Sequence, residues 1–233
     1  MKINFNCDLE SLEGVKFYKR KTIGIYIKAD GTVEIRAPYG CSLKAIEDFV
    51  NKRKRWIEFH SRKRKAEYEE ATNFSFSEGE KISILGKTYY LSKGRTFKFE
   101  GDTLLFPEGD IFYVRKQFTK FLKKVMLDEL TPLIEKYSEI TGLYPREVKV
   151  SSAKRRWASC SGRNSLNFSL YLAFGDEYII EYIIVHELCH IKEKNHSRSF
   201  WHLVEEYMPD YNKRKEALRL LEKRIFKEGI HDL

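Results

Sequence analysis

The feature that most constrains the fold is a nearly continuous apolar run from Tyr178 to Ile191, long enough for about four helical turns. A helix that is apolar on all sides is buried, so we expect this segment to form a central helix of the core. Polar side chains interrupt the run at Glu181, His186, Glu187 and His190. An unsatisfied buried polar group costs roughly 1 to 3 kcal/mol, so the histidines and Glu187 need a partner, which a metal ion would supply.

The spacing of these polar residues is that of the metal-binding motif HExxH. His186 and His190 lie four residues apart on one face of a helix, so both rings can reach a single ion at about 2.0 to 2.1 Å. Glu187 is rotated by one residue, which keeps its carboxylate off the ion but close enough to take a proton from bound water. His196 follows six residues after His190, and the chain would turn back there to close a three-histidine site. Metzincins have Gly in the turn where this chain has Glu193, which argues against a metzincin proper.

Other interpretations of the same region stay open at this point. HExxH fixes three positions, so it also arises by chance on ordinary helices. Glu205 or Glu206, from the following helix, is an alternative third ligand. Cys189 is turned off the metal face by its position in the helix, and we expect it in the core. Tyr207 and Tyr211 either stabilise an oxyanion or pack in the core.

Short patterns on both sides of the motif point to a family. They read RWASCS over 156–161, SLNFSLYLA over 165–173, VHELCHIKEKNHSRSFW over 185–201 and YMPDY over 207–211. On these motifs the chain resembles the YgjP-like metal-dependent hydrolases and metallopeptidases, which are related to the SprT-like and WLM-type zinc metallopeptidases. The resemblance covers residues 148–233 in motif detail. Ala158 and Met208 stand where the family has Gly and Leu.

The resemblance implies an α+β fold with a zincin-like metallopeptidase domain, and a peptidase that uses one Zn²⁺ per chain. It implies that His186, His190 and His196 bind the ion and that Glu187 is the catalytic base. In many zincins the substrate pairs with a strand edge beside the motif helix, and we expect residues 156–161 or 167–172 to form that edge. The candidate substrate-binding residues are Arg156, Trp157, Ser159 and Asn167.

The pattern of the whole chain predicts a strand-rich accessory domain over residues 1–105 and the zincin-like catalytic domain over 106–233. In the first part, alternation and turn residues predict strands over 22–28, 33–37, 81–85, 87–91, 96–99 and 103–106, and one helix over 42–70. From Ile111, apolar residues at three- and four-residue spacing predict a long helix that ends by Gly142. Pro132 should kink or restart this helix, with Thr131 as the cap of its second piece.

Basic charge is the second informative feature, since the formal net charge is +9. The predicted basic helix carries Lys and Arg at 52–55 and again at 62–65, separated by a segment that contains Trp56, Ile57 and Phe59. A nucleic acid is therefore a candidate partner of Lys52–Lys65. The alternative is a solvated helix whose apolar stripe packs on the sheet. SprT-like and WLM-type relatives act on proteins attached to DNA, so DNA-associated proteins are candidate substrates; arginines near the cleft, Arg156 among them, could instead select acidic substrates.

Composition limits the expected cellular location of the protein, and two alternative functions remain open. The four cysteines form no CxxC pair, the N-terminal residues form no apolar segment, and no run of 18 apolar residues occurs, so we expect a cytoplasmic protein with reduced thiols and no membrane partner. Two other functions remain: a zinc hydrolase of non-peptide amides or esters, and a nucleic-acid-binding module with a structural metal. A structural zinc site needs four closed ligands and has no use for Glu187, which disfavours the second.

Overall fold

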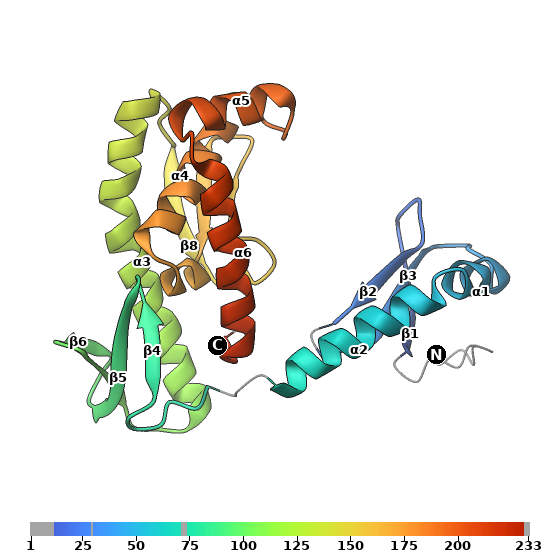
Figure 1. Ribbon diagram of the computed structural model, residues 1–233, viewed down its shortest axis with the longest axis horizontal. Helices are drawn as coiled ribbons and strands as arrows, with labels where there is room; N and C mark the ends of the chain where they lie inside the picture. Colours follow the sequence, from blue (N-terminus) through green and yellow to red (C-terminus); the bar gives the residue numbers. More distant parts are fainter. Residues whose placement is uncertain (1–11, 29, 71–73, 231–233) are drawn as a thin grey trace. The chain divides into compact units, whose positions relative to one another are not determined.

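The chain divides into two compact units, Met1–Thr72 and Asn73–Leu233, and the computed structural model describes residues 12–28, 30–70 and 74–230 of them (Figure 1). We expected the boundary at residue 105 instead. The strands between residues 81 and 107 belong to the second unit, because their buried side chains, such as Ile84 and Leu104, share one core with Phe118 of the helix that follows. The strand-rich part of the sequence is therefore split between the two units.

The first unit is a three-stranded sheet with two helices packed on one of its faces. The strand order is β1-β3-β2, and the central β3 is parallel to β1 and antiparallel to β2. Its elements are β1 (Leu12–Tyr18), β2 (Gly24–Ile27), β3 (Val33–Pro38), α1 (Leu43–Asn51) and α2 (Lys54–Glu70). The buried side chains of this small core are Val33, Ile35, Ala37, Ile46, Val50 and Ile57.

The single helix expected over 42–70 is two helices in the structure. The Ser42 hydroxyl caps the first, accepting a hydrogen bond from the backbone N–H of Ala45 at 3.3 Å. At the end of α1 the N–H of Arg53 donates to the carbonyl of Val50, a three-residue hydrogen bond that tightens the last turn and ends the helix. Because α2 begins at Lys54, the first block of basic residues lies at the junction of the two helices.

The second unit opens with a four-stranded sheet in the order β4-β5-β7-β6, in which β5 and β7 are parallel and each outer strand is antiparallel to its neighbour. These strands are β4 (Lys81–Ile84), β5 (Lys87–Gly94), β6 (Lys98–Glu100) and β7 (Thr103–Pro107). The sheet leads into α3 (Ile111–Thr141), which runs along the second unit (Figure 1).

Helix α3 continues through Pro132, so of the two expected outcomes, a kink or a restart, the structure excludes the restart. The helix is capped by Asp110 at its start and ends at Gly142, whose φ of 68° suits the left-handed conformation that glycine adopts readily. Thr131 caps nothing, because its hydroxyl donates to the carbonyl of Leu127 at 2.8 Å within the same helix. Burial of α3 side chains on both sides of the proline, including Leu130, outweighs the lost backbone hydrogen bond.

A second sheet and four helical segments complete the unit. The strand order is β8-β10-β9, with β10 parallel to β8 and antiparallel to β9. The elements are β8 (Glu147–Ser151), β9 (Ala158–Cys160), β10 (Ser165–Ser169), the 3₁₀ helix η1 (Leu170–Phe174), α4 (Glu177–Lys192), α5 (Arg198–Tyr207) and α6 (Tyr211–Lys227). Among the residues that the structure describes, no helix is long and apolar enough to cross a membrane.

A network of charged side chains ties α4 to its neighbours α3 and α6. Glu181 of α4 accepts hydrogen bonds from Lys136 of α3 and from Arg214 of α6, each at 2.8 Å. The side chains of Glu181 and Arg214 retain only 12% and 13% of their solvent exposure. Burial acts to raise the pKa of Glu181, but the hydrogen bonds from Lys136, Arg214 and Tyr137 outweigh it and lower the pKa below its ordinary value. The network therefore holds α4 between the other two helices.

We expect Arg214→Met to destabilise the second unit by about 3 kcal/mol, because it removes the more deeply buried of the two cationic partners of the Glu181 carboxylate. The midpoint of urea unfolding would measure this. Arg219→Met is the matched control, since Arg219 lies on the same helix in an exposed pair with Glu216 and should change the midpoint little. Because the folded-state pKa of Glu181 is lowered, the contribution is present above the ordinary value of 4.5 and is lost as the pH falls through the folded-state pKa.

Candidate metal centre

The polar residues of the motif lie in the C-terminal half of α4, a helix that is buried along most of its length. Asp176 caps the start of this helix, since its side chain accepts a hydrogen bond from the N–H of Ile179 at 3.0 Å. His186 and His190 lie one turn apart and are half-buried, whereas Glu187 between them is only 5% exposed. The apolar sequence thus places a carboxylate and two imidazoles inside the core.

The third histidine reaches the same point from the segment between α4 and α5. The chain leaves α4 at Glu193 and enters α5 at Ser197, whose hydroxyl caps the new helix. His196 lies in this turn, and its Nε2 is 3.0 Å from Nε2 of His186 and 3.2 Å from Nε2 of His190. Two nitrogens bound to one tetrahedral zinc ion at about 2.0 to 2.1 Å would lie about 3.4 Å apart. The spacing of the three rings therefore fits a single ion.

The protonation of the rings also fits a metal. Nδ1 of His190 donates to the carbonyl of Glu193 at 2.8 Å, which leaves the Nε2 lone pair of a neutral ring directed at the other histidines. Burial lowers the pKa of His186 to about 3, so this ring is neutral as well. An N–H on His196 could satisfy only one of the two facing nitrogens. Nitrogen lone pairs held this close need a cation, and imidazole donors suit zinc and other transition metals.

Two aromatic residues of α5 hold the histidine rings in place. Phe200 is fully buried and stacks on His190, with ring centroids 4.4 Å apart and an interplanar angle of 24°. Trp201 stacks on His196 at 5.7 Å and on Tyr211 at 5.6 Å. The motifs in the sequence do not predict the stacking of Trp201 on His196. Both residues follow His196 within five positions, which is the signal that could have revealed them.

Glu187 faces the free edge of β9. The backbone N–H of Cys160 lies near enough to the carboxylate to act on its pKa, while the Glu187 Oε2 is buried and has no partner among the described residues. Burial raises the pKa of Glu187 to about 7, although the nearby Arg156 and the N–H of Cys160 act in the opposite direction. The buried Oε2 is thus free to accept a proton.

The strand register decides which edge a substrate can reach. In the β9–β10 pair, the N–H of Ser161 donates to Ser165 and the N–H of Ser169 donates to Trp157, so alternate residues of β9 face β10. Ala158 and Cys160 therefore direct their backbone groups toward the open side. Strand β10 lies between β8 and β9, so residues 167–172, the alternative expected from the sequence, do not form a free edge.

The four predicted substrate-binding residues have different surroundings in the structure. Arg156 is exposed and near Glu187, whereas Trp157 is half-buried against the core. Ser159 is paired with Asn167 of the central strand, and the Asn167 amide donates to Ser151 of β8 at 2.9 Å. Among these four residues, Arg156 is the one whose charge acts on the pKa of Glu187.

The remaining candidates of the sequence lie outside the cluster. Glu205 and Glu206 are exposed on α5 and are not part of the metal-binding group formed by the described residues. The Tyr207 hydroxyl donates to the carbonyl of Thr141 at 3.2 Å. Cys189 is fully buried, as expected for a core residue. The Glu205 and Glu206 alternatives for a third ligand therefore lose their geometric basis.

A centre of three convergent histidines beside a buried glutamate, on a fold of mixed helices and sheets, is typical of metal-dependent hydrolases. The family model described as YgjP-like, metallopeptidase domain, matches residues 21–220, and the chain belongs to this family. One similar solved structure is the crystal structure of the metallopeptidase zymogen of Pyrococcus abyssi abylysin, with 26% identity, a TM-score of 0.36, and coverage of 40% of this chain and 92% of that chain. No curated protein matches.

Membership of this family defines the general class of enzyme. The protein is a metal-dependent hydrolase of the metallopeptidase class, with a divalent metal and a peptide or protein substrate. The expected α+β, zincin-like fold is confirmed at the level of its mixed helices and small sheets.

Proposed function

We propose that the protein is a zinc-dependent peptidase in which His186, His190 and His196 hold the ion and Glu187 is the general base. The observation that carries the proposal is the convergence of three ring nitrogens at 3.0 and 3.2 Å, with an unpartnered carboxylate oxygen in the next helical position. When bound, zinc polarises the scissile carbonyl and lowers the pKa of a water ligand toward about 7.

The chain's own residues would then carry the proton and orient the substrate. Glu187 accepts the proton of the attacking water through Oε2 and delivers it to the leaving amine. The nearby backbone N–H of Cys160 would help to stabilise the ionised form of this carboxylate before the transfer. The outward backbone groups of Ala158 would pair with an extended substrate, and recognition through the main chain makes sequence specificity broad.

The open edge of β9 favours a peptide over the alternative of a non-peptide amide or ester, because an extended chain can use the unpaired backbone groups. Three ligands beside a carboxylate with a free oxygen also favour catalysis over the alternative of a structural metal. The proposed substrates include proteins bound to DNA, and the basic residues at the junction of α1 and α2 support this part of the proposal.

Removing the metal tests the peptidase directly. We expect unfolded casein to be cleaved by the purified chain, cleavage to stop with a transition-metal chelator, and activity to return on addition of one equivalent of Zn²⁺. Newly formed amino groups, measured with an amine-reactive dye, report peptide hydrolysis, and a p-nitrophenyl ester is the comparison substrate. Hydrolysis of the ester without any cleavage of casein would reject the peptidase in favour of the small-substrate hydrolase.

A further inference from the structure

Helix α2 presents large aromatic side chains to solvent. Trp56 is 50% exposed and Phe59 is 64% exposed. His60 lies between them, with ring centroids 4.4 Å from Trp56 and 5.2 Å from Phe59. The helix is held to its sheet by Ile57 and Ser61, its buried side chains among those described. The aromatic residues therefore lie on the side of α2 that faces away from the core of the first unit.

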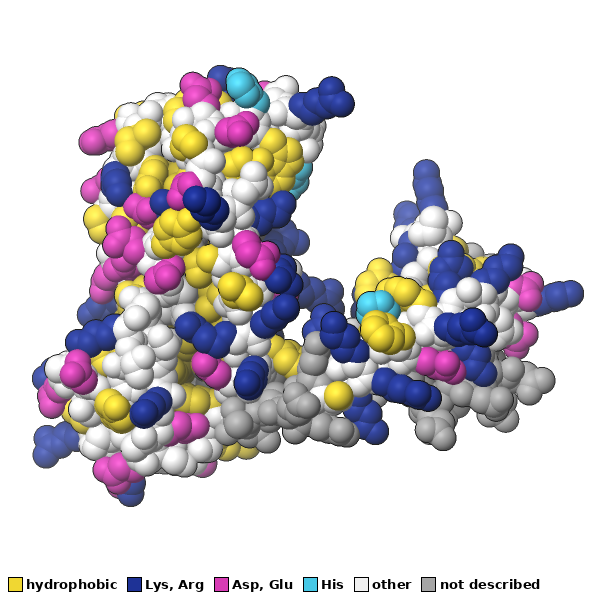
Figure 2. All heavy atoms as spheres, in the orientation of Figure 1, with side chains coloured by type: hydrophobic (Ala, Val, Ile, Leu, Met, Phe, Trp, Pro, Cys, Tyr) yellow, Lys and Arg dark blue, Asp and Glu magenta, His cyan; other side chains and the backbone are white. Residues whose placement is uncertain are grey.

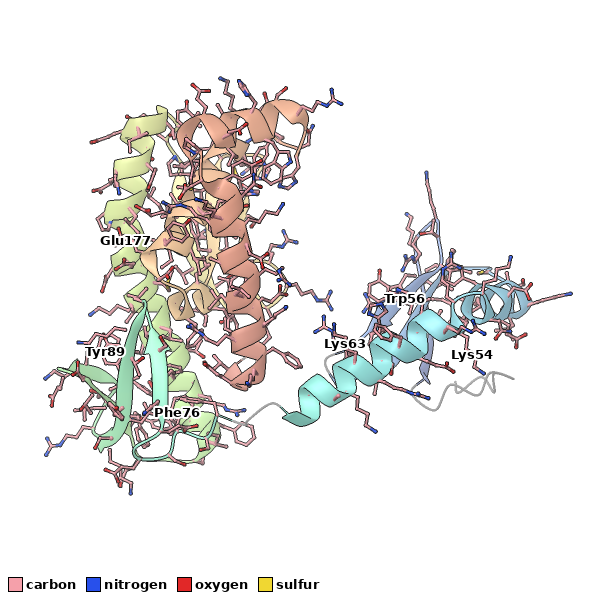
Figure 3. All side chains as sticks on the ribbon, viewed as in Figure 1. Lys54, Trp56, Lys63, Phe76, Tyr89 and Glu177 are labelled. Atoms are coloured by element: carbon pink, nitrogen blue, oxygen red, sulfur yellow. The ribbon has the colours of Figure 1, made fainter. Side chains whose placement is uncertain are left out.

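Basic side chains surround this aromatic face. Lys63 follows Trp56 by seven residues and so shares its side of the helix, and both are labelled in Figure 3. Figure 2 shows apolar and histidine side chains gathered over α2, with Lys and Arg side chains next to them. These exposed aromatic rings and cations do not contribute to the packing of the core of the first unit.

A concave site adjoins the aromatic face. A cavity of about 1050 Å³ lies at the junction of α1 and α2, and it is lined by Ile25, Phe49, Asn51, Lys52, Arg53, Lys54, Arg55, Trp56 and Glu58. Arg53 contacts Phe49 there, since its guanidinium lies 4.0 Å over the Phe49 ring and donates to the Phe49 carbonyl at 3.3 Å. An arginine placed over a ring and hydrogen-bonded to a carbonyl still has N–H groups that can bind a phosphate.

We infer that this surface of the first unit binds single-stranded nucleic acid, with phosphates in the basic cavity and bases stacked on Trp56 and Phe59. Unpaired bases expose the ring faces that stack on aromatic side chains, whereas a duplex hides them. An anionic membrane would need a continuous apolar face on the helix, and His60 and Lys63 interrupt this one. The inference supplies a partner for the proposed action on DNA-bound proteins, but it rests on the first unit alone.

The test is binding of the full chain to a fluorescein-labelled 20-nucleotide oligothymidylate, followed by fluorescence anisotropy. We expect Trp56→Ala and Phe59→Ala each to raise Kd by about 5- to 150-fold, the usual effect of removing one base–aromatic stack. Tyr39→Ala and Phe112→Ala are matched controls, because these aromatic residues are 72% and 80% exposed elsewhere in the chain. Circular dichroism would check that each variant is folded.

Two further measurements separate stacking from charge. Oligothymidylate should quench tryptophan fluorescence in the wild type, and Trp56→Phe should lose most of the quenching while still binding. The double variant Lys52→Gln/Lys54→Gln should reduce the slope of log Kd against log salt by about 0.7 for each phosphate that the lysines no longer neutralise. Each result supports a strand that crosses both the cavity and the aromatic face.

Other results would overturn the inference. These are unchanged affinity in both aromatic variants, tighter binding of a 20-base-pair duplex than of the single strand, or binding to phosphatidylserine vesicles without binding to the oligonucleotide. Glu187→Gln should bind the oligonucleotide as the wild type does. A failure of nucleic-acid binding and a failure of the peptidase assignment therefore give different results.

Discussion

Glu187→Gln is expected to lower kcat for peptide hydrolysis by about 10²- to 10⁴-fold while one metal ion per chain is retained. The amide has nearly the shape of the carboxylate, so the cluster of histidines is preserved, but it cannot accept the proton of the attacking water. Glu187 is buried, and its Oε2 has no hydrogen-bond partner among the described residues. Initial rates on a fluorogenic peptide, with metal content by elemental analysis, measure both parts of the prediction.

The control for this substitution is Glu205→Gln, which removes an exposed carboxylate from the neighbouring helix α5 and should leave kcat unchanged. Near-normal activity of the Glu187 variant at full metal content would reject Glu187 as the base. Loss of metal together with activity would assign it a different role, as a residue that maintains the site.

Substitution of a histidine in the metal-binding group should weaken metal binding, and the loss of activity should follow from the loss of metal. We expect His186→Ala and His190→Ala each to weaken metal binding by more than about 100-fold, because even loss of an outer hydrogen-bond partner of a ligand costs 10- to 100-fold. Peptidase activity should fall with the metal content. Dialysis against a zinc buffer followed by elemental analysis gives the affinity, and the wild type should hold one ion per chain.

His202→Ala is the matched control, since His202 is exposed on α5 and lies outside the metal-binding group of the described residues. It should bind the metal as the wild type does. His196→Ala tests the third position, and full metal binding by this variant would contradict a three-histidine centre. Addition of imidazole to the His196 variant should restore part of the activity if the ring acts as a ligand.

The metal-binding group was predictable from the sequence because its geometry is mostly local. His186, Glu187 and His190 lie within one turn of a helix, and the apolar residues around them require that helix to be buried. His196 follows a short turn after α4, so it must also lie close to the end of that helix. By contrast, the position of Cys160 near Glu187 depends on how β9 packs against α4, and no local sequence pattern predicts that packing.

Elements that depend on distant partners were harder to predict. Strand β1 was not expected, because its short apolar alternation becomes a strand only through parallel pairing with β3. The strand expected to reach Leu172 ends at Ser169 and continues as η1, whose five residues are all buried. The boundary between the two compact units depends on distant partners as well. It lies between residues 72 and 73, because the strands from β4 to β7 bury their apolar side chains against α3.

The orientation of the His190 ring is set by the position at which α4 ends. The acceptor of its Nδ1–H is the main-chain carbonyl of residue 193, in the C-cap of the helix, and every amino acid provides that group. A change of side chain at this position would leave the acceptor in place, whereas a change in the length of the turn would move it. In this part of the site, evolution is therefore free in the choice of residue but constrained in the number of residues.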